Sequence, residues 1–119
     1  MNFEFSPAEQ AFAEEVRGFL RAHPPQTFPV DGMDAGYGSG AHSRPFLRAL
    51  ADRGWLTMTW PRGFGGQERS LMYTLVLFEE LASVGAPFGP LAGCNQTAEG
   101  IIRYGSESLR REVLPRIGR

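Results

Sequence analysis

The sequence predicts an all-α fold, a compact bundle of about five helices with a long Gly/Pro-rich loop and one short extended segment. Three observations predict it. Apolar residues recur at spacings of three and four along most of the chain, serines stand where helices would begin, and glycine or proline follows where they would end. A chain of 119 residues, 42% of them hydrophobic, is long enough for one core and too short for two, so we expect a single domain over residues 1–119.

Charge balance and residue counts exclude several classes of site. With 12 Lys+Arg against 13 Asp+Glu, the chain lacks the basic surface that nucleic acid requires. No apolar run is long enough to span a membrane, and the N-terminal residues lack the pattern of a secretory signal. One cysteine and two histidines supply neither an internal disulfide nor a zinc site. We therefore expect a cytoplasmic protein with no nucleic-acid partner, no membrane span and no metal.

The first helix is predicted to begin at Pro7, because Ser6 and Glu9 form a capping box around it. Its apolar face consists of Phe12, Val16, Phe19 and Leu20. The sequence His-Pro-Pro at 23–25 should end it, since proline restricts the residue before it. Residues 24–42 are rich in proline and glycine and show no periodicity, so they predict a long loop that we expect to be mobile.

The second helix is predicted to begin after Ser43 and to end at Gly54, where a left-handed residue would close it. Its inward residues are Phe46, Leu47, Leu50 and Ala51. Residues 55–60 read Trp-Leu-Thr-Met-Thr-Trp and alternate weakly in polarity, which indicates an extended segment. That segment would lead into a loop with three glycines in four positions, at 63, 65 and 66.

Three more helices are predicted beyond this loop. Ser70 would begin the third, over 71 to about 84, which is apolar on most sides and therefore central. The stretch 85–90 separates it from a fourth helix that ends at Gly105. Ser106 would begin the fifth, with a glutamate near its positive end. The apolar face of the fifth helix is Leu109, Val113, Leu114 and Ile117.

The glycine loop allows two interpretations, a phosphate cradle or a turn. An extended segment, a glycine loop and a helix follow one another in nucleotide-binding proteins. Here, however, the third glycine of that pattern would fall at Glu68, whose carboxylate would repel a pyrophosphate. The chain also has no Gly-Lys-Ser/Thr tripeptide and no alternation of strands and helices. These residues favour the turn.

Several titratable residues have structural explanations. Glu79 and Glu80 point about 100° apart on a helix and cannot share one proton, so we expect one to be solvated and the other ion-paired. Cys94 has no histidine predicted beside it and is expected to be a small core residue. His23 and His42 border the long loop and are expected to be exposed.

The fourth predicted helix contains two glycines, Gly93 and Gly100, each costing about 1 kcal/mol relative to alanine inside a helix. Something is therefore expected to approach its backbone closely. One candidate is another helix packed on the glycines. The other is a ligand chain, with Gln96 and Thr97 beside it. The residues alone leave both alternatives open.

The order of motifs resembles the N-terminal helical domain of the acyl-CoA dehydrogenases across nearly the whole chain. The motifs that carry the resemblance are Ser6-Pro7-x-x-Gln10, Leu50-Ala51-x-x-Gly54-Trp55, Trp60-Pro61-x-x-Phe64-Gly65-Gly66, Phe78-Glu79-Glu80-Leu81-Ala82 with Gly85-Ala86-Pro87, and Arg103-Tyr104-Gly105-Ser106-Glu107 leading to Leu114-Pro115-x-Ile117. The Trp-Pro turn and the Glu-Glu-Leu-Ala segment look like the branch of the family that handles bulky or unusual CoA esters.

The resemblance implies a larger flavoprotein of fatty acid or lipid metabolism. In the family, a middle β-domain binds FAD and a four-helix domain follows it. A glutamate base removes the α-proton of an acyl-CoA thioester while the flavin takes a hydride from the β-carbon. Since this chain matches only the first domain, we expect it to bind no cofactor, to contain no catalytic residue and to be inactive alone. The role of the base is not assigned to Glu79, Glu80 or Glu99.

The resemblance also implies a substrate site on the fourth helix, which lines the acyl pocket in the family. By that likeness the substrate-binding residues are Gln96, Thr97, Gly100 and Ile101. The expected role of the chain is to form part of this pocket wall and to pack on the FAD domain, with homo-oligomers or self-association through uncovered apolar surface. The alternative is a standalone helical interaction module, or a non-catalytic partner subunit of a flavoprotein. The gene sequence beyond Arg119 distinguishes the two.

Overall fold

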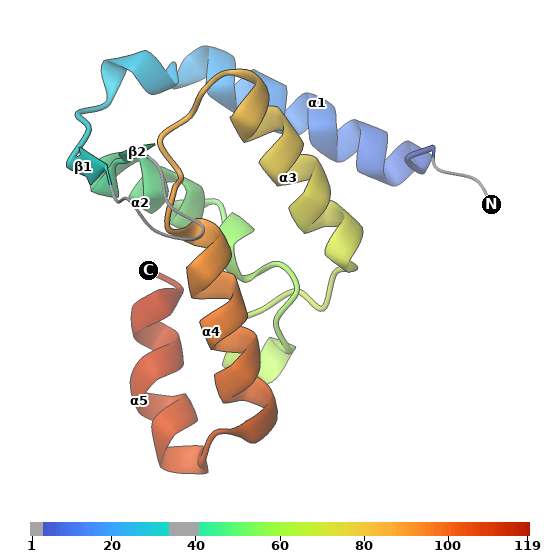
Figure 1. Ribbon diagram of the computed structural model, residues 1–119. Coiled ribbons are helices and arrows are strands. Elements are labelled where there is room, and N and C mark those ends of the chain that lie inside the picture. The colour runs from blue at the N-terminus through green and yellow to red at the C-terminus, as the bar shows by residue number, and fades with distance from the viewer. Residues whose placement is uncertain (1–3, 34–40) are drawn as a thin grey trace.

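The computed structural model of the protein describes residues 4–33 and 41–119. Within them the predicted all-α fold is confirmed (Figure 1). Five α-helices follow one another, α1 (Pro7–Ala22), α2 (Arg44–Asp52), α3 (Leu71–Ser83), α4 (Leu91–Tyr104) and α5 (Glu107–Ile117). In the described part of the chain, no helix has the length and apolar character needed to cross a bilayer.

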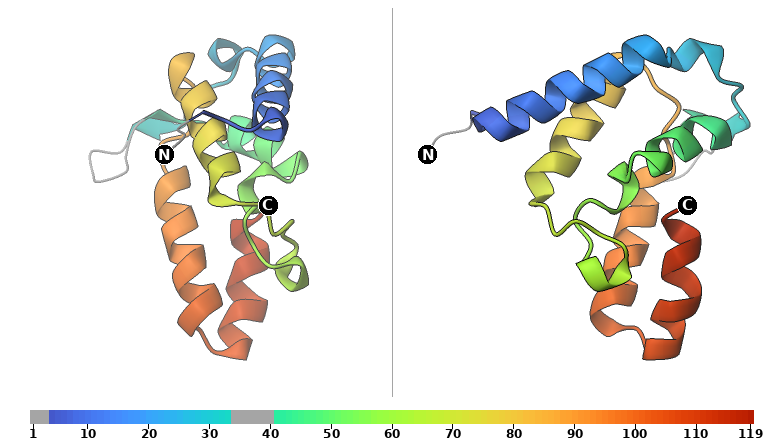
Figure 2. Two further views of the ribbon diagram at one scale, coloured as in Figure 1. Left: turned by 90° about the vertical axis from the view of Figure 1, so that its right-hand side faces the viewer. Right: turned by 180° about the vertical axis from the view of Figure 1, so that it is seen from behind.

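The helices form two groups with separate cores (Figure 2). Helices α1 and α3 pack on each other at one end of the molecule, with α2 beside them, and α4 and α5 form an antiparallel hairpin at the other end. The larger core includes Phe12, Phe19, Phe46, Leu50, Trp55 and Leu81. The smaller core is built from Trp60, Ala98 and Leu114. Four partly buried residues pack at its edge, Phe64, Ile101, Ile102 and Ile117. Trp60 therefore connects the segment before α3 to the hairpin.

Helix α1 begins at the predicted capping box. The Ser6 hydroxyl accepts a hydrogen bond from the Glu9 N–H at 3.2 Å, and the Ser6 N–H donates to the Glu9 carboxylate at 2.9 Å. These two bonds satisfy donors that the first turn of a helix otherwise leaves unpaired. Ser70 holds the same position before α3, yet its side chain makes no capping hydrogen bond.

Ser6→Ala should lower the free energy of unfolding by about 1 kcal/mol, because the hydroxyl that satisfies the Glu9 N–H is lost. Urea unfolding followed by circular dichroism measures this. Ser70→Ala is the matched control, and its effect should be close to zero since no capping bond is removed. Equal losses in the two variants would contradict the assignment of the cap.

The predicted long loop at 24–42 contains more structure than expected. A 3₁₀ helix, η1, covers Pro25–Thr27. Strand β1 (Gly32–Met33) pairs antiparallel with β2 (Ala41–His42), and His42 also bridges to Phe88. These bonds fasten both ends of the loop to the body of the domain. The mobility expected for its middle concerns residues 34–40, which lie outside the described part of the chain.

The prediction of an extended segment at 55–60 is wrong. Its first half is a 3₁₀ helix, η2 (Trp55–Thr57), which follows Gly54 in the left-handed conformation with φ 74°. The physical reason is burial, because Trp55, Met58 and Trp60 are all 5% exposed or less. An extended strand would direct residues 55 and 58 to opposite faces, whereas a tight helical turn places residues three apart on the same side.

Candidate functional site

The glycine loop is a closed turn, as the residues favoured, and not a phosphate cradle. After the 3₁₀ helix η3 (Arg62–Phe64), the chain folds back onto Trp60. The N–H groups of Phe64, Gly65, Gly66 and Glu68 all donate to carbonyls of residues 60–62. Because these donors are used inside the turn, they are not available to a pyrophosphate. The Glu68 carboxylate adds a negative charge there and pairs with Arg62 at 3.0 Å. This turn therefore does not fit a dinucleotide cofactor.

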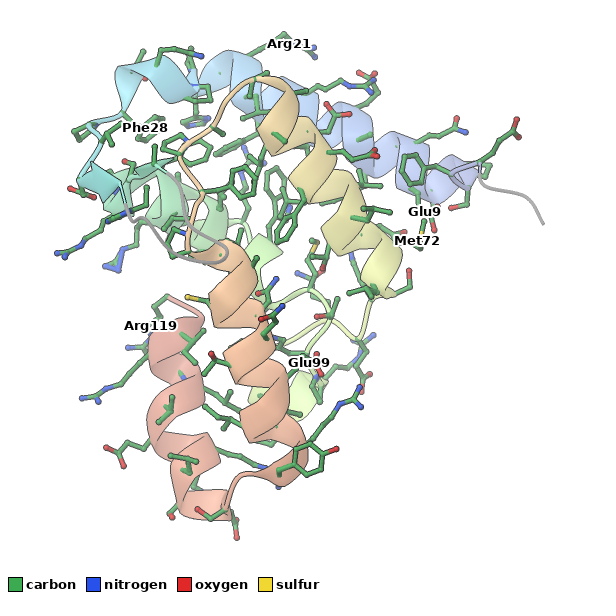
Figure 3. The ribbon with its side chains drawn as sticks, viewed as in Figure 1. Glu9, Arg21, Phe28, Met72, Glu99 and Arg119 are labelled. Carbon is green, nitrogen blue, oxygen red and sulfur yellow. The ribbon has the colours of Figure 1, made fainter. Side chains whose placement is uncertain are left out.

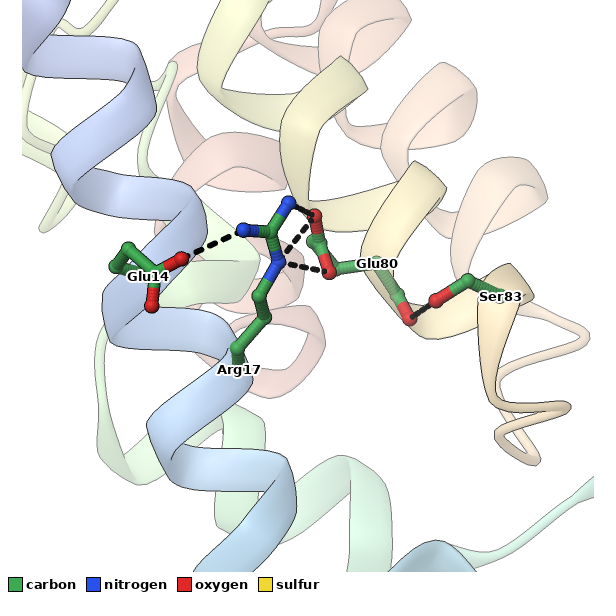
Figure 4. Close-up of polar contacts among 4 residues, drawn as sticks. All are labelled: Glu14, Arg17, Glu80 and Ser83. Atoms are coloured by element: carbon green, nitrogen blue, oxygen red, sulfur yellow. Dashed lines mark hydrogen bonds and ion pairs between the residues drawn. The ribbon is translucent and has the colours of Figure 1, made fainter.

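The adjacent glutamates of α3 have the structural roles expected for them. Arg17 of α1 donates three hydrogen bonds to the Glu80 carboxylate at 2.8–3.1 Å and one to Glu14 at 2.6 Å (Figure 4). These carboxylates, Glu80 first, raise the pKa of Arg17, so the guanidinium stays charged. Glu79 is exposed. The Arg17–Glu80 pair joins α1 to α3 and is not an acid/base site.

Three expectations about single residues are wrong. Cys94 is exposed instead of belonging to the core. Within this chain α4 buries only Leu91 and Ala98, and Cys94 borders a cavity of about 310 Å³ that α4 shares with the end of α5. His23 and His42 are half-buried instead of exposed. The His23 ring stacks on Phe19 with ring centroids 4.5 Å apart, which keeps it from solvent.

Helix α4 has an open face that carries most of the predicted substrate residues. Gly93, Gln96, Thr97 and Gly100 have the i, i+3, i+4, i+7 spacing of one helix face, and all four are exposed. A Cβ atom built on Gly93 or Gly100 would meet no described atom within 4 Å. No described helix of this chain therefore packs on these glycines, which leaves the ligand alternative or a surface from elsewhere in a larger protein.

Two residues qualify this prediction. Ile101 is half-buried and packs on the Trp60 cluster, so it supports α4 from behind and does not lie on the open face. Tyr104 is 87% exposed and stands four residues after Gly100, which places it on the open face. The sequence prediction did not include Tyr104, although its spacing from Gly100 was a sufficient signal.

A cleft of about 650 Å³ runs beside the open face, between α3 and α4. Small-molecule sites are typically about 300–1,000 Å³. One wall combines the apolar side chains of Trp60, Leu71 and Phe78 with polar residues, which are Thr59, Arg69 and Thr74. The edge contributed by α4 includes Gln96, Glu99 and Arg103. Glu99 lies on the side of α4 that is turned toward the loop before α3 (Figure 3). Gln96 belongs both to the cleft and to the open face.

Comparison with known proteins identifies this arrangement. The family model described as acyl-CoA dehydrogenase, N-terminal domain, matches residues 6–119. The chain belongs to the acyl-CoA dehydrogenase family. It matches the N-terminal domain of that family of oxidoreductases, as the resemblance implied.

Relatives of this acyl-CoA dehydrogenase domain are much longer than the chain. The acyl-CoA dehydrogenase FadE26 of Mycobacterium tuberculosis is 31% identical, over 98% of this chain and 30% of that protein. The ChsE4-ChsE5 complex from Mycobacterium tuberculosis contains a chain that is 27% identical with a TM-score of 0.72, over 99% of this chain and 29% of that one. The Tcur3481-Tcur3483 steroid ACAD matches at 27% identity and a TM-score of 0.77, over 99% of this chain and 30% of that one. The chain thus spans about 30% of the length of these relatives.

Proposed function

We propose that this domain is part of an FAD-dependent enzyme that dehydrogenates the α,β bond of a CoA thioester with a bulky, fused-ring acyl group. The observation that carries the proposal is the open face of α4, where a Cβ atom on Gly93 or Gly100 would meet no described atom within 4 Å and Thr97 is exposed. The description of one relative as a steroid ACAD supports the fused-ring substrate class. Because glycine has no side chain, Gly93 and Gly100 leave room on this face for a wide ligand.

The residues of this chain have a binding role in the proposed reaction. FAD, held by the part of the enzyme outside this chain, would supply the hydride acceptor. The Thr97 hydroxyl and the Gln96 amide can donate to or accept from the acyl group, and Gly93 and Gly100 let it approach the helix backbone. Tyr104 would close the far end of the same face. Together these residues would orient the acyl group and exclude water from it.

Exposed apolar side chains at the start of α3 support the proposal that further domains or subunits cover this chain. Leu71, Met72 and Leu75 are 75%, 38% and 45% exposed. Contiguous exposed apolar side chains are typical of surfaces that another protein surface covers. The FAD domain is the proposed cover, and self-association would result where it is absent. The two solved structures named above are each described with a pair of proteins, which supports assembly into a complex.

The enzyme proposal has a direct test. The full-length product of the gene that encodes this chain should copurify with flavin, and a fused-ring acyl-CoA should bleach the flavin absorbance. The 119 residues alone should be colourless and inactive. A full-length product without flavin, or one whose flavin no acyl-CoA bleaches, would contradict the proposal.

Gly100→Leu tests the role of the open face. In the full-length enzyme it should lower kcat/KM for a fused-ring acyl-CoA roughly 10- to 100-fold, because overfilling a packed site costs about 1–3 kcal/mol. The isolated domain should be unchanged or slightly more stable, since Gly100 meets no described atom and leucine is the better helix former. Glu112→Leu, at an exposed position of α5, is the control and should leave kcat/KM unchanged. Unaltered kinetics in Gly100→Leu would place the acyl group elsewhere.

A further inference from the structure

The edge that α4 contributes to the cleft begins at Ala92 and is polar from Asn95 onward. Gln96, Glu99 and Arg103 stand at i, i+3 and i+7, so their side chains follow one line of the helix beside the cleft. The opposite wall offers the apolar side chains of Leu71, Phe78 and Trp60, and also the polar side chains of Thr59, Arg69 and Thr74. The cleft is therefore amphiphilic, with apolar surface beside Leu71 and Phe78 and hydrogen-bonding groups on both walls.

Arg103 has N–H donors that no described residue engages. Its one ion pair in the described part of the chain is to Glu99, at 3.4 Å from Nε, and the two side chains are 69% and 43% exposed. A guanidinium has five N–H donors, so most of those on Arg103 remain for a ligand. By contrast, Arg17 is fully engaged by Glu80 and Glu14. Arg69 also lines the cleft, but its guanidinium lies over the Tyr73 and Phe12 rings, at 4.8 and 5.7 Å from their centroids, and is held on the α3 side.

A hydrocarbon acyl chain would match only the apolar part of this cleft. It would cover Leu71 and Phe78, but it would take water from the polar side chains without replacing the lost hydrogen bonds. A rigid apolar skeleton that carries a ketone or hydroxyl matches both the apolar and the polar part. The ketone oxygen accepts from a guanidinium or an amide N–H, and a hydroxyl can also donate to the Glu99 carboxylate.

We propose that Arg103, oriented by Glu99 and assisted by Gln96, binds a ketone or hydroxyl oxygen of the acyl group and so selects oxygen-bearing acyl-CoA esters. The proposal rests on the proposed function, because it requires the acyl group to extend from the open face of α4 into the cleft. Gln96 belongs to both surfaces and marks the place where they join. Arg103 is a specificity residue in this scheme and takes no part in bond breaking.

The test compares two CoA thioesters with the same fused-ring skeleton, one with a ring ketone and one with a methylene group in its place. In the wild-type full-length enzyme the ketone ester should have the higher kcat/KM. Arg103→Met should lower kcat/KM for the ketone ester roughly 10- to 100-fold, the range for a lost hydrogen bond to a charged group, and leave the methylene ester within about twofold. Arg103→Lys should recover part of the loss, because it restores the charge without the planar fork.

Arg111→Met is the matched control. Arg111 forms an equivalent i,i+4 pair with Glu107 on α5, both side chains are at least 75% exposed, and neither lines the cleft. Arg111→Met should leave kcat/KM unchanged for both esters. Equal losses for both esters in Arg103→Met, or no loss for either, would overturn the selectivity proposal while the enzyme remained active. A wild-type enzyme that processes neither ester, nor any other acyl-CoA, would instead overturn the proposed function itself.

Discussion

Gly66→Ala should destabilise the domain by about 3 kcal/mol, the upper range for forcing an extra carbon into a packed site. A Cβ atom on Gly66 would lie 1.9 Å from the Trp60 carbonyl oxygen and 2.3 Å from its carbonyl carbon. Both are backbone atoms, so no side chain can rotate away to make room. The displaced backbone is that of Trp60, which anchors the smaller core. Urea or thermal unfolding of the 119-residue domain, followed by tryptophan fluorescence, measures the loss.

The same turn contains its own controls. Gly63→Ala should change stability by less than about 0.5 kcal/mol, because its Cβ would meet no described atom within 4 Å and its φ is ordinary. Gly65→Ala should lie between, with a loss of about 1–2 kcal/mol, since Gly65 has φ 84° in open space. The expected destabilisation is therefore largest for Gly66→Ala, smaller for Gly65→Ala and smallest for Gly63→Ala. A uniform effect at the three positions would contradict the described turn.

Phe46→Ala should destabilise the domain by about 3–5 kcal/mol, a large fraction of the roughly 5–15 kcal/mol by which ordinary domains are stable. Phe46 is fully buried, and its ring contacts Phe28 and Phe19 with centroids 5.2 and 6.5 Å apart. Removing the ring leaves a cavity between α1, α2 and the segment that joins them. Chemical denaturation gives the free energy of unfolding directly.

Leu71→Ala is the matched control for this core substitution. Leu71 is also a large apolar residue at the beginning of a helix, but it is 75% exposed, so its loss should change stability by less than about 0.5 kcal/mol. The same variant should weaken any self-association of the isolated domain, because it removes apolar surface. If Leu71→Ala destabilised the monomer as much as Phe46→Ala, the assignment of inside and outside on α3 would be wrong.

The helices could be predicted from the sequence because their start and stop signals are local. Ser6, Ser43 and Ser106 each accept a hydrogen bond from the N–H three residues later, as the capping pattern requires. Gly54 adopts the left-handed conformation expected where a helix ends. The pairing of one α3 glutamate could also be foreseen, but its partner, 63 positions away in the chain, could not.

The segment 55–60 and the cleft escaped prediction for the same physical reason. Six residues are too few for a periodicity to decide between a strand and a tight turn, and the burial of Trp55 and Met58 on one core decides it. The cleft is formed between α3 and α4, which are separate in sequence, so no local sequence pattern predicts it. The expectation that Cys94 belongs to the core is wrong. Its small apolar neighbours in sequence do not show which side of α4 other parts of the chain cover.

The open face of α4 has an evolutionary consequence. Gly93 and Gly100 meet no described atom, and Thr97 is exposed, so substitutions there leave the interior of the domain intact. Gly66 permits almost no substitution, because a Cβ atom there would clash with the Trp60 backbone. The domain thus contains positions where substitution costs little stability, such as Gly93 and Gly100, and positions where it costs much, such as Gly66. A lineage could remodel the shape of this face by successive point mutations without first acquiring compensating stability elsewhere.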